Sequence, residues 1–525
     1  MKKNLLLFAM ALLPLFVQGA VGIDNIYYEL YSSPSGNTAA VTSHPYKYGG
    51  ELNIPPTVVY IGVEYNVTSI IDYAICENDQ LTSVSIPGSV TTIGESAFYN
   101  CRALTTVTLQ NGIETIGRDA FYGCTSLTSV TIPGSVNTIG EFAFGLCTQM
   151  TSATIEDGVP SISAYAFSEC TSLTSVSIPS SVTSIGNQAF AYCGLTSVTI
   201  PGSVTDLGAW TFNRCVDLQS VTIEEGVTTI SNYTFLECFS LTSVSIPSSV
   251  TTIGDGAFLS CTSLPGVTIP ANVTSIGDEA FSRCSSLASI TIPRNVTSIG
   301  RTPFSACLNL TAMNVENGNT VYDSREDCNA IIETATNTLS YACKQTTIPS
   351  SVTTIGASAF SELSSMTTVS IPATVKSIAQ EAFYLCSGLT DVYCYAEEIP
   401  QTHNEAFSGA SITTAKLHVP ESVVSLYASI KPWSYFGEVV ALDDVPKPTG
   451  MAATATKPVS VKTSGGVIFV NGLYDTAEVK VYTADGAFVG TARAIDHTAT
   501  ITTPLAPGTV AVVVMGKKAM KVVVR

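Results

Sequence analysis

A unit of about 23 residues recurs along most of this chain, and no other feature restricts the possible folds as strongly. The copy at residues 81–103 reads LTSVSIPGSVTTIGESAFYNCRA, and later copies keep its apolar positions. A phenylalanine marks each copy, with a regular step of 23 residues that shortens to 22 between Phe190 and Phe212. The markers are Phe98, Phe121, Phe144, Phe167, Phe190, Phe212, Phe235, Phe258, Phe281, Phe304, Phe360, Phe383 and Phe407, and Ile75 stands where an earlier one would fall.

One unit already predicts its own local structure. Val84 and Ile86 alternate with polar residues, which indicates a short strand with one buried face. Ala97, Phe98 and Cys101 are spaced like the inner face of a single helical or 3₁₀ turn on the opposite wall. A lone unit cannot cover its apolar face, whereas about fourteen stacked units make a continuous core. The period therefore predicts an α/β-type leucine-rich-repeat solenoid with a curved parallel sheet, concave on the strand side.

The repeat LxxVxIPxxVxxIGxxAFxxC resembles the BspA-like leucine-rich repeat of bacterial surface proteins, over about residues 25–440. We assign residues 66–420 to the solenoid, with a long insertion at 308–350 that resembles the long variant repeat of that family. The resemblance implies surface display and adhesion to host matrix proteins, other cells or epithelium. It implies no catalytic residues.

The first residues predict export. Two lysines precede the apolar run LLLFAMALLPLFV at 5–17, and small residues follow, which is the layout of a signal peptide over residues 1–20. Thirteen residues are too short to cross a hydrocarbon core of about 30 Å, so we expect no transmembrane span. The predicted location is secreted or at the cell surface, on the exterior of the outer membrane.

The remaining segments read as caps, a linker and a second domain. Residues 21–65 predict an N-terminal β cap, and residues 421–442 predict a C-terminal cap, in which a helix over 425–442 would carry Trp433 and Phe436 onto the last repeat. Residues 443–460 are rich in Pro, Ala and Thr and predict a linker.

Residues 461–525 alternate β-rich stretches with glycine turns and predict an all-β sandwich. They resemble the C-terminal sorting domain of the type IX secretion system, through Val481-Tyr482 with Asp485-Gly486, Leu505 to Gly508, and the terminal Lys521 to Arg525. The alternative is an additional adhesive or capping β-domain.

Composition narrows the function. The net charge is −18 with only 23 Lys and Arg, which disfavours capture of nucleic acid. The four histidines are not at metal-ligand spacing, and we find no nucleophile elbow, phosphate-binding loop, zinc-protease or EF-hand motif. We therefore predict a protein that is not an enzyme and has no metal or cofactor. The expected partners are an extracellular protein, from host matrix or bacterial surface, or a glycan; the sequence does not set the oligomeric state.

Equivalent positions of successive repeats form columns, and three columns are candidates for function. The first is the outward strand position, which should cover the concave face with hydroxyls; it comprises Ser85, Thr108, Thr131, Thr154, Ser177, Thr199, Thr222, Ser245, Thr268 and Thr291. Its functional interpretation is a nearly uncharged surface for a protein or glycan, and the alternative is that threonine simply suits an exposed strand.

The second column lies two residues before each marker phenylalanine. Four of five consecutive repeats are aromatic there, at Phe142, Tyr165, Trp210 and Tyr233. An exposed aromatic line would suit sugar rings or a protein hot spot, whereas the alternative is that the rings fold onto neighbouring turns. A purely structural surface-layer component is a third possible function.

The third column is cysteine, three residues after the marker in most repeats. We interpret it as core packing, with disulfides or metal as the alternatives. Cys328 and Cys343 differ, because they flank a predicted hairpin in which Ile332 faces Leu339, and this register would place the two cysteines opposite each other as a disulfide candidate.

Overall fold

The computed structural model describes residues 17–442 and, near the end of the chain, residues 460–464, 467–471, 478–484, 487–493, 498–506, 508–515 and 518–524. The chain divides into two compact units, Met1–Leu442 and Asp443–Arg525. Most of the predicted signal peptide and nearly all of the predicted linker lie outside the described residues. The first described strand, β1, spans Val17–Ile23, so the predicted end of the signal peptide at residue 20 falls within it.

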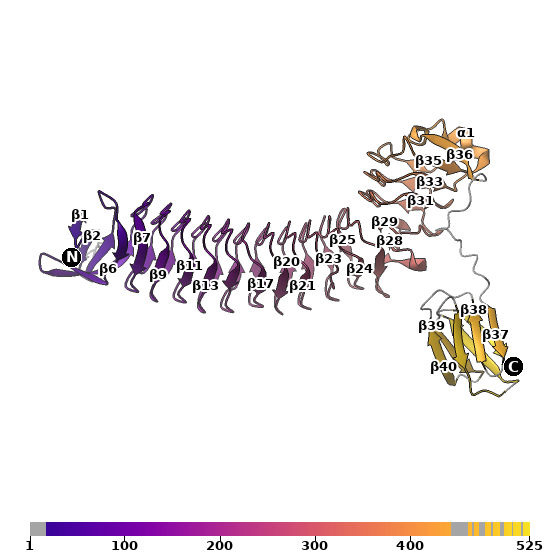
Figure 1. Cartoon of the computed structure of the whole chain (residues 1–525), viewed down its shortest axis with the longest axis horizontal. Helices are drawn as coiled ribbons and strands as arrows, with labels where there is room; N and C mark the ends of the chain where they lie inside the picture. Colours follow the sequence, from indigo (N-terminus) through magenta and orange to yellow (C-terminus); the bar gives the residue numbers. More distant parts are fainter. Residues whose placement is uncertain are drawn as a thin grey trace, which may run out of the picture. The chain divides into compact units, whose positions relative to one another are not determined.

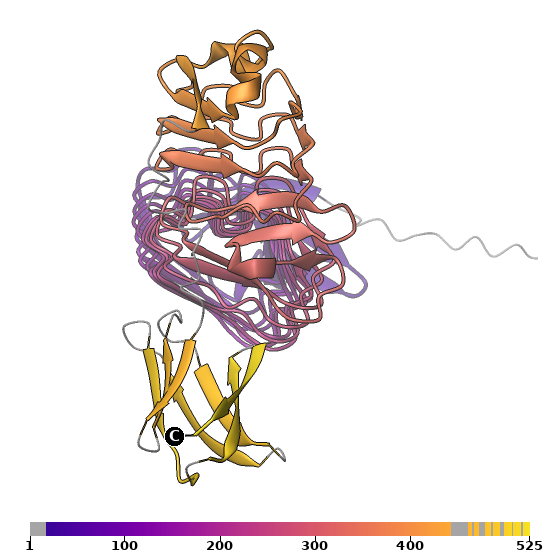
Figure 2. The same ribbon diagram turned by 90° about the vertical axis from the view of Figure 1, so that its right-hand side faces the viewer.

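The first unit is built from stacked coils of chain, each of which we call a rung (Figure 1). Viewed along the stack, the rungs superpose around a common interior (Figure 2). The marker phenylalanines are buried inside, and those from Phe98 to Phe304 stack face to face with ring centroids 4.9 to 6.0 Å apart. The rung spacing is therefore the stacking distance of an aromatic ring, and the solenoid predicted from the repeat is confirmed.

On the long-strand side, parallel strands pair in register within groups of two or three rungs, as Ser83 and Val84 do with Thr106 and Val107. Inward Val and Ile alternate with outward Ser and Thr, because successive side chains of a strand point to opposite faces. These strands are β4 (Gly50–Asn53), β7 (Leu81–Ile86), β9 (Thr106–Leu109), β11 (Ser129–Ile132), β13 (Ser152–Ile155), β15 (Ser175–Ser177), β17 (Ser197–Ile200), β19 (Ser220–Ile223), β21 (Ser243–Ser245), β24 (Ser289–Ile292) and β26 (Ala312–Val315).

The short-strand side follows after a turn that contains proline in most rungs, and each of its strands has two residues. An isoleucine or leucine points inward and a hydroxyl or carboxylate residue precedes it. The strands are β8 (Thr92–Ile93), β10 (Thr115–Ile116), β12 (Thr138–Ile139), β14 (Ser161–Ile162), β16 (Ser184–Ile185), β18 (Asp206–Leu207), β20 (Thr229–Ile230), β22 (Thr252–Ile253), β23 (Ser275–Ile276) and β25 (Ser298–Ile299).

The turn side holds the marker phenylalanines, and here the prediction of a helical or 3₁₀ turn is wrong. Ser96 and Asn100 have φ of +52° and +54°, in the left-handed region, and their equivalents in other rungs do the same. Ser96 N donates to Arg118 O of the next rung at 2.8 Å, and Phe98 N donates to Ala120 O at 2.7 Å. Alternate backbone donors therefore join one rung to the next, whereas Tyr99 N and Cys101 N donate to carbonyls of their own rung.

Antiparallel strands precede the first repeat. They are β1, β2 (Ile26–Ser33), β3 (Gly36–Val41), β5 (Thr57–Tyr60) and β6 (Val63–Ile70). β3 pairs with β6 in parallel, and β6 continues into the short-strand side through β8. The apolar interior of the stack is thus continuous with this β-sheet.

The insertion separates the rungs into a first stack, ending at β26, and a second stack with its own core. It contains β27 (Tyr322–Asp323), a 3₁₀ turn at Arg325–Asp327, β28 (Ala330–Glu333) and β29 (Thr338–Ala342). β29 pairs with the first short strand of the second stack, so the inserted hairpin replaces a rung. The second stack comprises β30 (Thr354–Ile355), β31 (Thr368–Ile371), β32 (Ser377–Ile378), β33 (Asp391–Cys394), β34 (Gln401–Thr402), β35 (Lys416–Val419) and β36 (Glu438–Ala441).

The end of the second stack corrects another prediction. Instead of a helix over 425–442, the chain forms a 3₁₀ turn at Glu421–Val423, α1 (Val424–Tyr427), a 3₁₀ turn at Trp433–Tyr435, and the strand β36. Pro432 has no backbone N–H to continue a helix. Trp433 and Phe436 nevertheless pack on the last marker, because both rings lie 5.4 Å from that of Phe407.

The second unit is an antiparallel β-sandwich, as predicted for the C-terminal fold. One sheet has the order β37–β38–β41 and the other β40–β39–β42–β43. The strands are β37 (Ser460–Ser464), β38 (Val467–Asn471), β39 (Glu478–Thr483), β40 (Phe488–Arg493), β41 (Thr498–Thr502), β42 (Val510–Met515) and β43 (Lys518–Val523). Apolar residues of both sheets, such as Ile468 and Val513, form the core.

Candidate functional site

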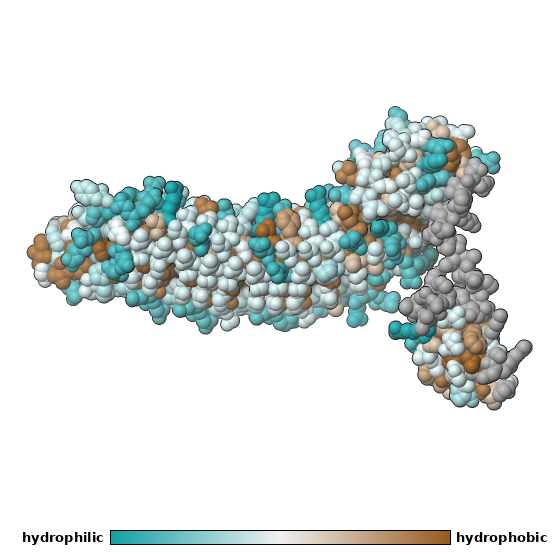
Figure 3. Space-filling view, in the orientation of Figure 1, coloured by the Kyte–Doolittle hydropathy of each residue, from teal (hydrophilic) through white to brown (hydrophobic). Residues whose placement is uncertain are grey.

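The predicted hydroxyl column forms a continuous strip along the first stack, which we call the hydroxyl strip. Ser85 is half-buried and its equivalents, such as Thr131 and Thr222, are exposed. In the described part of the chain, no hydrogen bond to the protein engages these side-chain hydroxyls. The side of the stack seen in Figure 3 is mostly pale, the colour of residues of intermediate hydropathy. The strip therefore offers many free donors and acceptors with little charge.

A neighbouring column of threonines forms hydrogen bonds between rungs. Thr105 Oγ1 donates to Thr82 O of the previous rung at 2.9 Å, and Thr151 Oγ1 donates to Thr128 O at 3.2 Å. These hydroxyls join the rungs together. Of two adjacent threonine columns on this side, only the hydroxyl strip is free for a ligand.

The hydroxyl strip ends with the first stack. In the second stack the equivalent positions are Ser370, Tyr393 and His418, which pair across β31, β33 and β35. The Tyr393 and His418 rings stack with centroids 4.4 Å apart, and both side chains are buried. His418 Nε2 lies 2.8 Å from Asp391 Oδ1. Burial would raise the pKa of Asp391, but the hydrogen bonds from His418 and Thr390, together with the nearby charge of Lys416, lower it.

The predicted aromatic column is present on the turn side, and none of its four rings is buried. Phe142 and Tyr165 stack with centroids 4.4 Å apart, and Trp210 and Tyr233 stack at 5.1 Å. Gln188 lies between the pairs, and its Nε2 donates to Tyr165 Oη at 2.8 Å.

The stacking limits what this column can bind. The two members of each pair lie on adjacent rungs, so each ring covers one face of the other. The second face of the Tyr233 ring lies against Gly256 of the following rung. A Cβ on Gly256 would lie 2.3 Å from the Tyr233 ring. The column therefore presents mainly ring edges, which are poorer platforms for a sugar than open faces.

The cysteine column lies in the core of the rungs. Each thiol donates to the backbone carbonyl of the preceding marker position, as in Cys124 Sγ to Phe98 O at 3.2 Å and Cys238 Sγ to Phe212 O at 3.3 Å. Burial raises the pKa of Cys238 well above that of a free thiol. Each cysteine thus fills the core as a small apolar side chain, and its thiol also donates a weak hydrogen bond to a buried carbonyl. The members are Cys101, Cys124, Cys147, Cys170, Cys193, Cys215, Cys238, Cys261, Cys284, Cys307 and Cys386.

Cys328 and Cys343 are both free thiols in this structure. Ile332 pairs with Leu339 as predicted, but a bulge between Ile331 and Ile332 shifts the register so that Ala330 faces Ala342. The shift removes the direct opposition of the two cysteines on which the disulfide candidate depended. Instead, Cys343 Sγ donates to Asn329 O at 3.2 Å.

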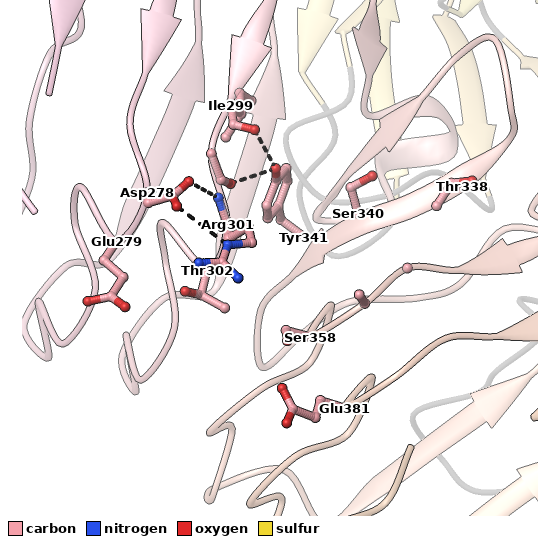
Figure 4. Close-up of a pocket in the computed structure, with 13 residues that line it drawn as sticks. Asp278, Glu279, Ile299, Arg301, Thr302, Thr338, Ser340, Tyr341, Ser358 and Glu381 are labelled. Atoms are coloured by element: carbon pink, nitrogen blue, oxygen red, sulfur yellow. Dashed lines mark hydrogen bonds and ion pairs between the residues drawn. The ribbon is translucent and has the colours of Figure 1, made fainter. Parts of the chain in front are cut away.

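The sequence did not indicate a cleft that lies between the two stacks. It has a volume of about 500 Å³ and is lined by Asp278, Arg301, Tyr341, Ser358 and Glu381, among others. Asp278 Oδ1 accepts from Arg301 N at 2.7 Å, and Figure 4 shows the Glu381 carboxylate on the opposite wall. Within the described residues no three His, Cys, Asp or Glu side chains could hold a metal ion. The cleft depends on the insertion, because Tyr341 belongs to the inserted hairpin.

The rungs, the parallel in-register strands and the stacked interior define the molecule as a leucine-rich-repeat solenoid. The family model described as BspA type leucine rich repeat region matches residues 68–195, 143–265, 183–311 and 336–430, which together are more than half of the chain. The chain belongs to the BspA-type leucine-rich-repeat family.

Solved structures of bacterial repeat proteins are similar in fold. A leucine rich cell surface protein from Faecalibacterium prausnitzii is 24% identical, with a TM-score of 0.42, over 81% of this chain and 94% of that one. A leucine-rich repeat protein from Bacteroides ovatus is 27% identical, with a TM-score of 0.33, over 58% and 97%. The pneumococcal vaccine antigen PcpA is 17% identical, with a TM-score of 0.38, over 82% and 100%. No curated protein matched the chain.

The described residues contain no helix with the length and apolar character needed to cross a membrane.

Proposed function

We propose that this protein is an exported, non-catalytic recognition protein of the bacterial surface, and that it binds an extracellular protein of a host matrix or of another bacterium through the hydroxyl strip. The observation that carries the proposal is the strip itself, from Ser85 to Thr291, whose outward hydroxyls form no hydrogen bond with any residue that the structure describes. Repeated, uncharged donors and acceptors on a stiff scaffold suit a flat protein surface, because little side-chain entropy is lost on binding. Family membership supports adhesion as the role.

The test is binding of the full-length secreted protein to immobilised host matrix proteins and to bacterial surface extracts. Thr131→Arg combined with Thr154→Arg places two bulky charges on the strip, and we expect binding to weaken at least about tenfold. Thr138→Arg is the matched control, because this exposed threonine lies on the short-strand side of the same rung. Binding that ignores the strip variant but not the control would refute the assignment of this side.

Export and attachment belong to the same proposal. The predicted signal peptide would direct the chain out of the cytoplasm, and the C-terminal β-sandwich would act as the type IX sorting domain. Deletion of residues 443–525 should leave the solenoid inside the outer membrane while its fold, judged by circular dichroism, stays intact. Secretion of the truncated chain would instead favour an adhesive role for the sandwich.

A further inference from the structure

One rung of the first stack is a residue short, and the loss is confined to its turn side. Between Cys193 and Leu195 there is only Gly194, where the previous rung has two residues between Cys170 and Leu173. A Cβ on Gly194 would lie 2.4 Å from Thr171 O, so the shortened turn is drawn against its neighbour. The result is a hollow of about 480 Å³ on the turn side, which we call the notch.

Large apolar side chains surround the notch. Tyr192 is 40% exposed, Val216 43% and Phe239 41%. The column that holds Val216 and Phe239 has threonine at Thr148, Thr171 and Thr262 in other rungs. Two successive rungs therefore replace a solvent-compatible residue by an exposed apolar one directly beside the shortened turn, and exposed apolar clusters of this kind mark binding sites.

Charged groups form another part of the lining. Arg214 Nε lies 2.7 Å from Glu237 Oε2, and the guanidinium lies 5.5 Å from the centroid of the Tyr192 ring. This ion pair and the ring hold one another in place along one wall, and the exposed carboxylate of Asp217 stands on the lining as well. The notch thus has an apolar surface bordered by donors and acceptors of both signs.

We propose that the notch binds a neutral sugar ring of an extracellular glycan. A pyranose has an apolar C–H face and a rim of hydroxyls, which match the apolar groups and the Arg214, Glu237 and Asp217 groups respectively. A wholly apolar side chain would leave those charged groups dehydrated without partners, which is unfavourable. A charged ligand would gain little, because the charges of Arg214 and Glu237 already pair with each other. The volume is within the usual range for small-ligand sites.

This inference goes beyond protein recognition through the hydroxyl strip, because it uses a different side of the solenoid. It also relocates the glycan site expected at the aromatic column, where the rings cover one another.

The test is affinity electrophoresis of the full-length protein in gels that contain a soluble mannan, a β-glucan or an α-glucan. We expect at least one of these neutral polysaccharides to retard the protein. Phe239→Thr restores the residue type that other rungs carry and should weaken that binding by about tenfold or more. The matched control is Leu308→Thr, which changes an exposed apolar residue of the same column outside the notch and should leave retardation unchanged.

Three further variants separate misfolding and the aromatic column from the notch. Insertion of a serine after Gly194 restores the regular step and should abolish retardation by filling the hollow, and Arg214→Met should weaken it without loss of the fold. Trp210→Ala should have no effect. Absence of retardation by all three polysaccharides, or retardation that survives Phe239→Thr and falls in Trp210→Ala, would overturn the proposal. Neither result touches binding of matrix proteins, which depends on Thr131 and Thr154.

Discussion

The long-strand side and the turn side of the first stack belong to the same rungs, yet they obey different rules. On the long-strand side, the outward residue is serine or threonine in rung after rung. On the turn side, the position two residues before the marker contains Ser96, Asp119, Phe142, Gln188 and Gly256, among others. All of these positions have positive φ, which glycine adopts at the lowest energy.

The difference shows where the fold leaves freedom. The outward position of a paired strand can hold any residue that is compatible with β-structure. Backbone geometry therefore does not require the serine and threonine that recur there, and their recurrence produces a regular surface. The turn side instead accepts bulky residues at a backbone conformation that opposes them. Tyr192, which lines the notch, is a bulky residue of this kind, with φ of +60°.

The largest expected effect separates the interior of the turn side from the exterior of the strand side. Phe212 is fully buried, with its ring 5.6 Å from those of Phe190 and Phe235. Phe212→Ala should lower the free energy of unfolding by about 3–5 kcal/mol, since it removes a ring and leaves a cavity. Thr199→Ala, on the hydroxyl strip, should change it by less than about 0.5 kcal/mol.

Urea unfolding followed by circular dichroism measures both changes. Because each rung contacts only its neighbours, the Phe212→Ala protein should also lose cooperativity and unfold in two steps. Equal losses in the two variants would show that the sides are not energetically distinct.

Thiol reactivity tests the same contrast, because it reports how accessible the cysteines of the turn side are to solvent. Cys238 is buried and its pKa is raised by that burial, whereas Cys76, at the start of the stack, is only half-buried. Iodoacetamide should label Cys76 in the native protein, and label Cys238 at least about a hundredfold more slowly, because a thiol must be ionised and accessible to react. Mass spectrometry after timed labelling measures this. Rapid labelling throughout would show that the rungs open locally.

Sequence reasoning was sufficient for the parts of the molecule that repeat. The spacing of the markers predicted their stacking, and the alternation at residues 81–86 predicted both the buried Val84 and the outward Ser85. It failed on the turn side, since a 3₁₀ turn and the observed left-handed turns place Ala97, Phe98 and Cys101 inward alike. Apolar spacing does not distinguish the two backbones.

Single irregularities were harder still. The bulge at Ile331 shifts a register that the pattern of side chains cannot report. The 22-residue step before Phe212 was visible, but the notch needs Tyr192, Val216 and Phe239 from three rungs, and only stacking brings them together.

The N-terminal hairpin extends the lesson about left-handed positions to a site outside the repeats. Ile61 lies in the two-residue turn between β5 and β6, with φ of +50° and 82% of its surface exposed. A β-branched residue is unfavourable at positive φ. In a two-residue turn of this kind, the position before the glycine is normally asparagine or aspartate. Ile61→Asn should therefore raise the free energy of unfolding by about 1 kcal/mol. Thermal unfolding measures the gain, and Val63→Asn, on the adjacent strand, is the control that should not share it.

The smallest expected effect concerns the second stack, where the strand side is not a hydroxyl strip but a buried ring pair beside Asp391. Burial would raise the pKa of Asp391, but hydrogen bonds from His418 and Thr390 and the nearby charge of Lys416 together outweigh it and lower that pKa below 3.8. A carboxyl whose pKa is lower in the folded state stabilises the fold above its unfolded pKa, and this contribution disappears as the pH falls through the folded value. Because the carboxylate is partly exposed, solvent screening keeps the effect to about 0.5 kcal/mol or less. Unfolding free energies measured between pH 5 and about pH 2.5 should fall less steeply for Asp391→Asn than for the unchanged protein. Identical slopes in the two proteins would mean that the surroundings of Asp391 in the second stack do not lower its pKa.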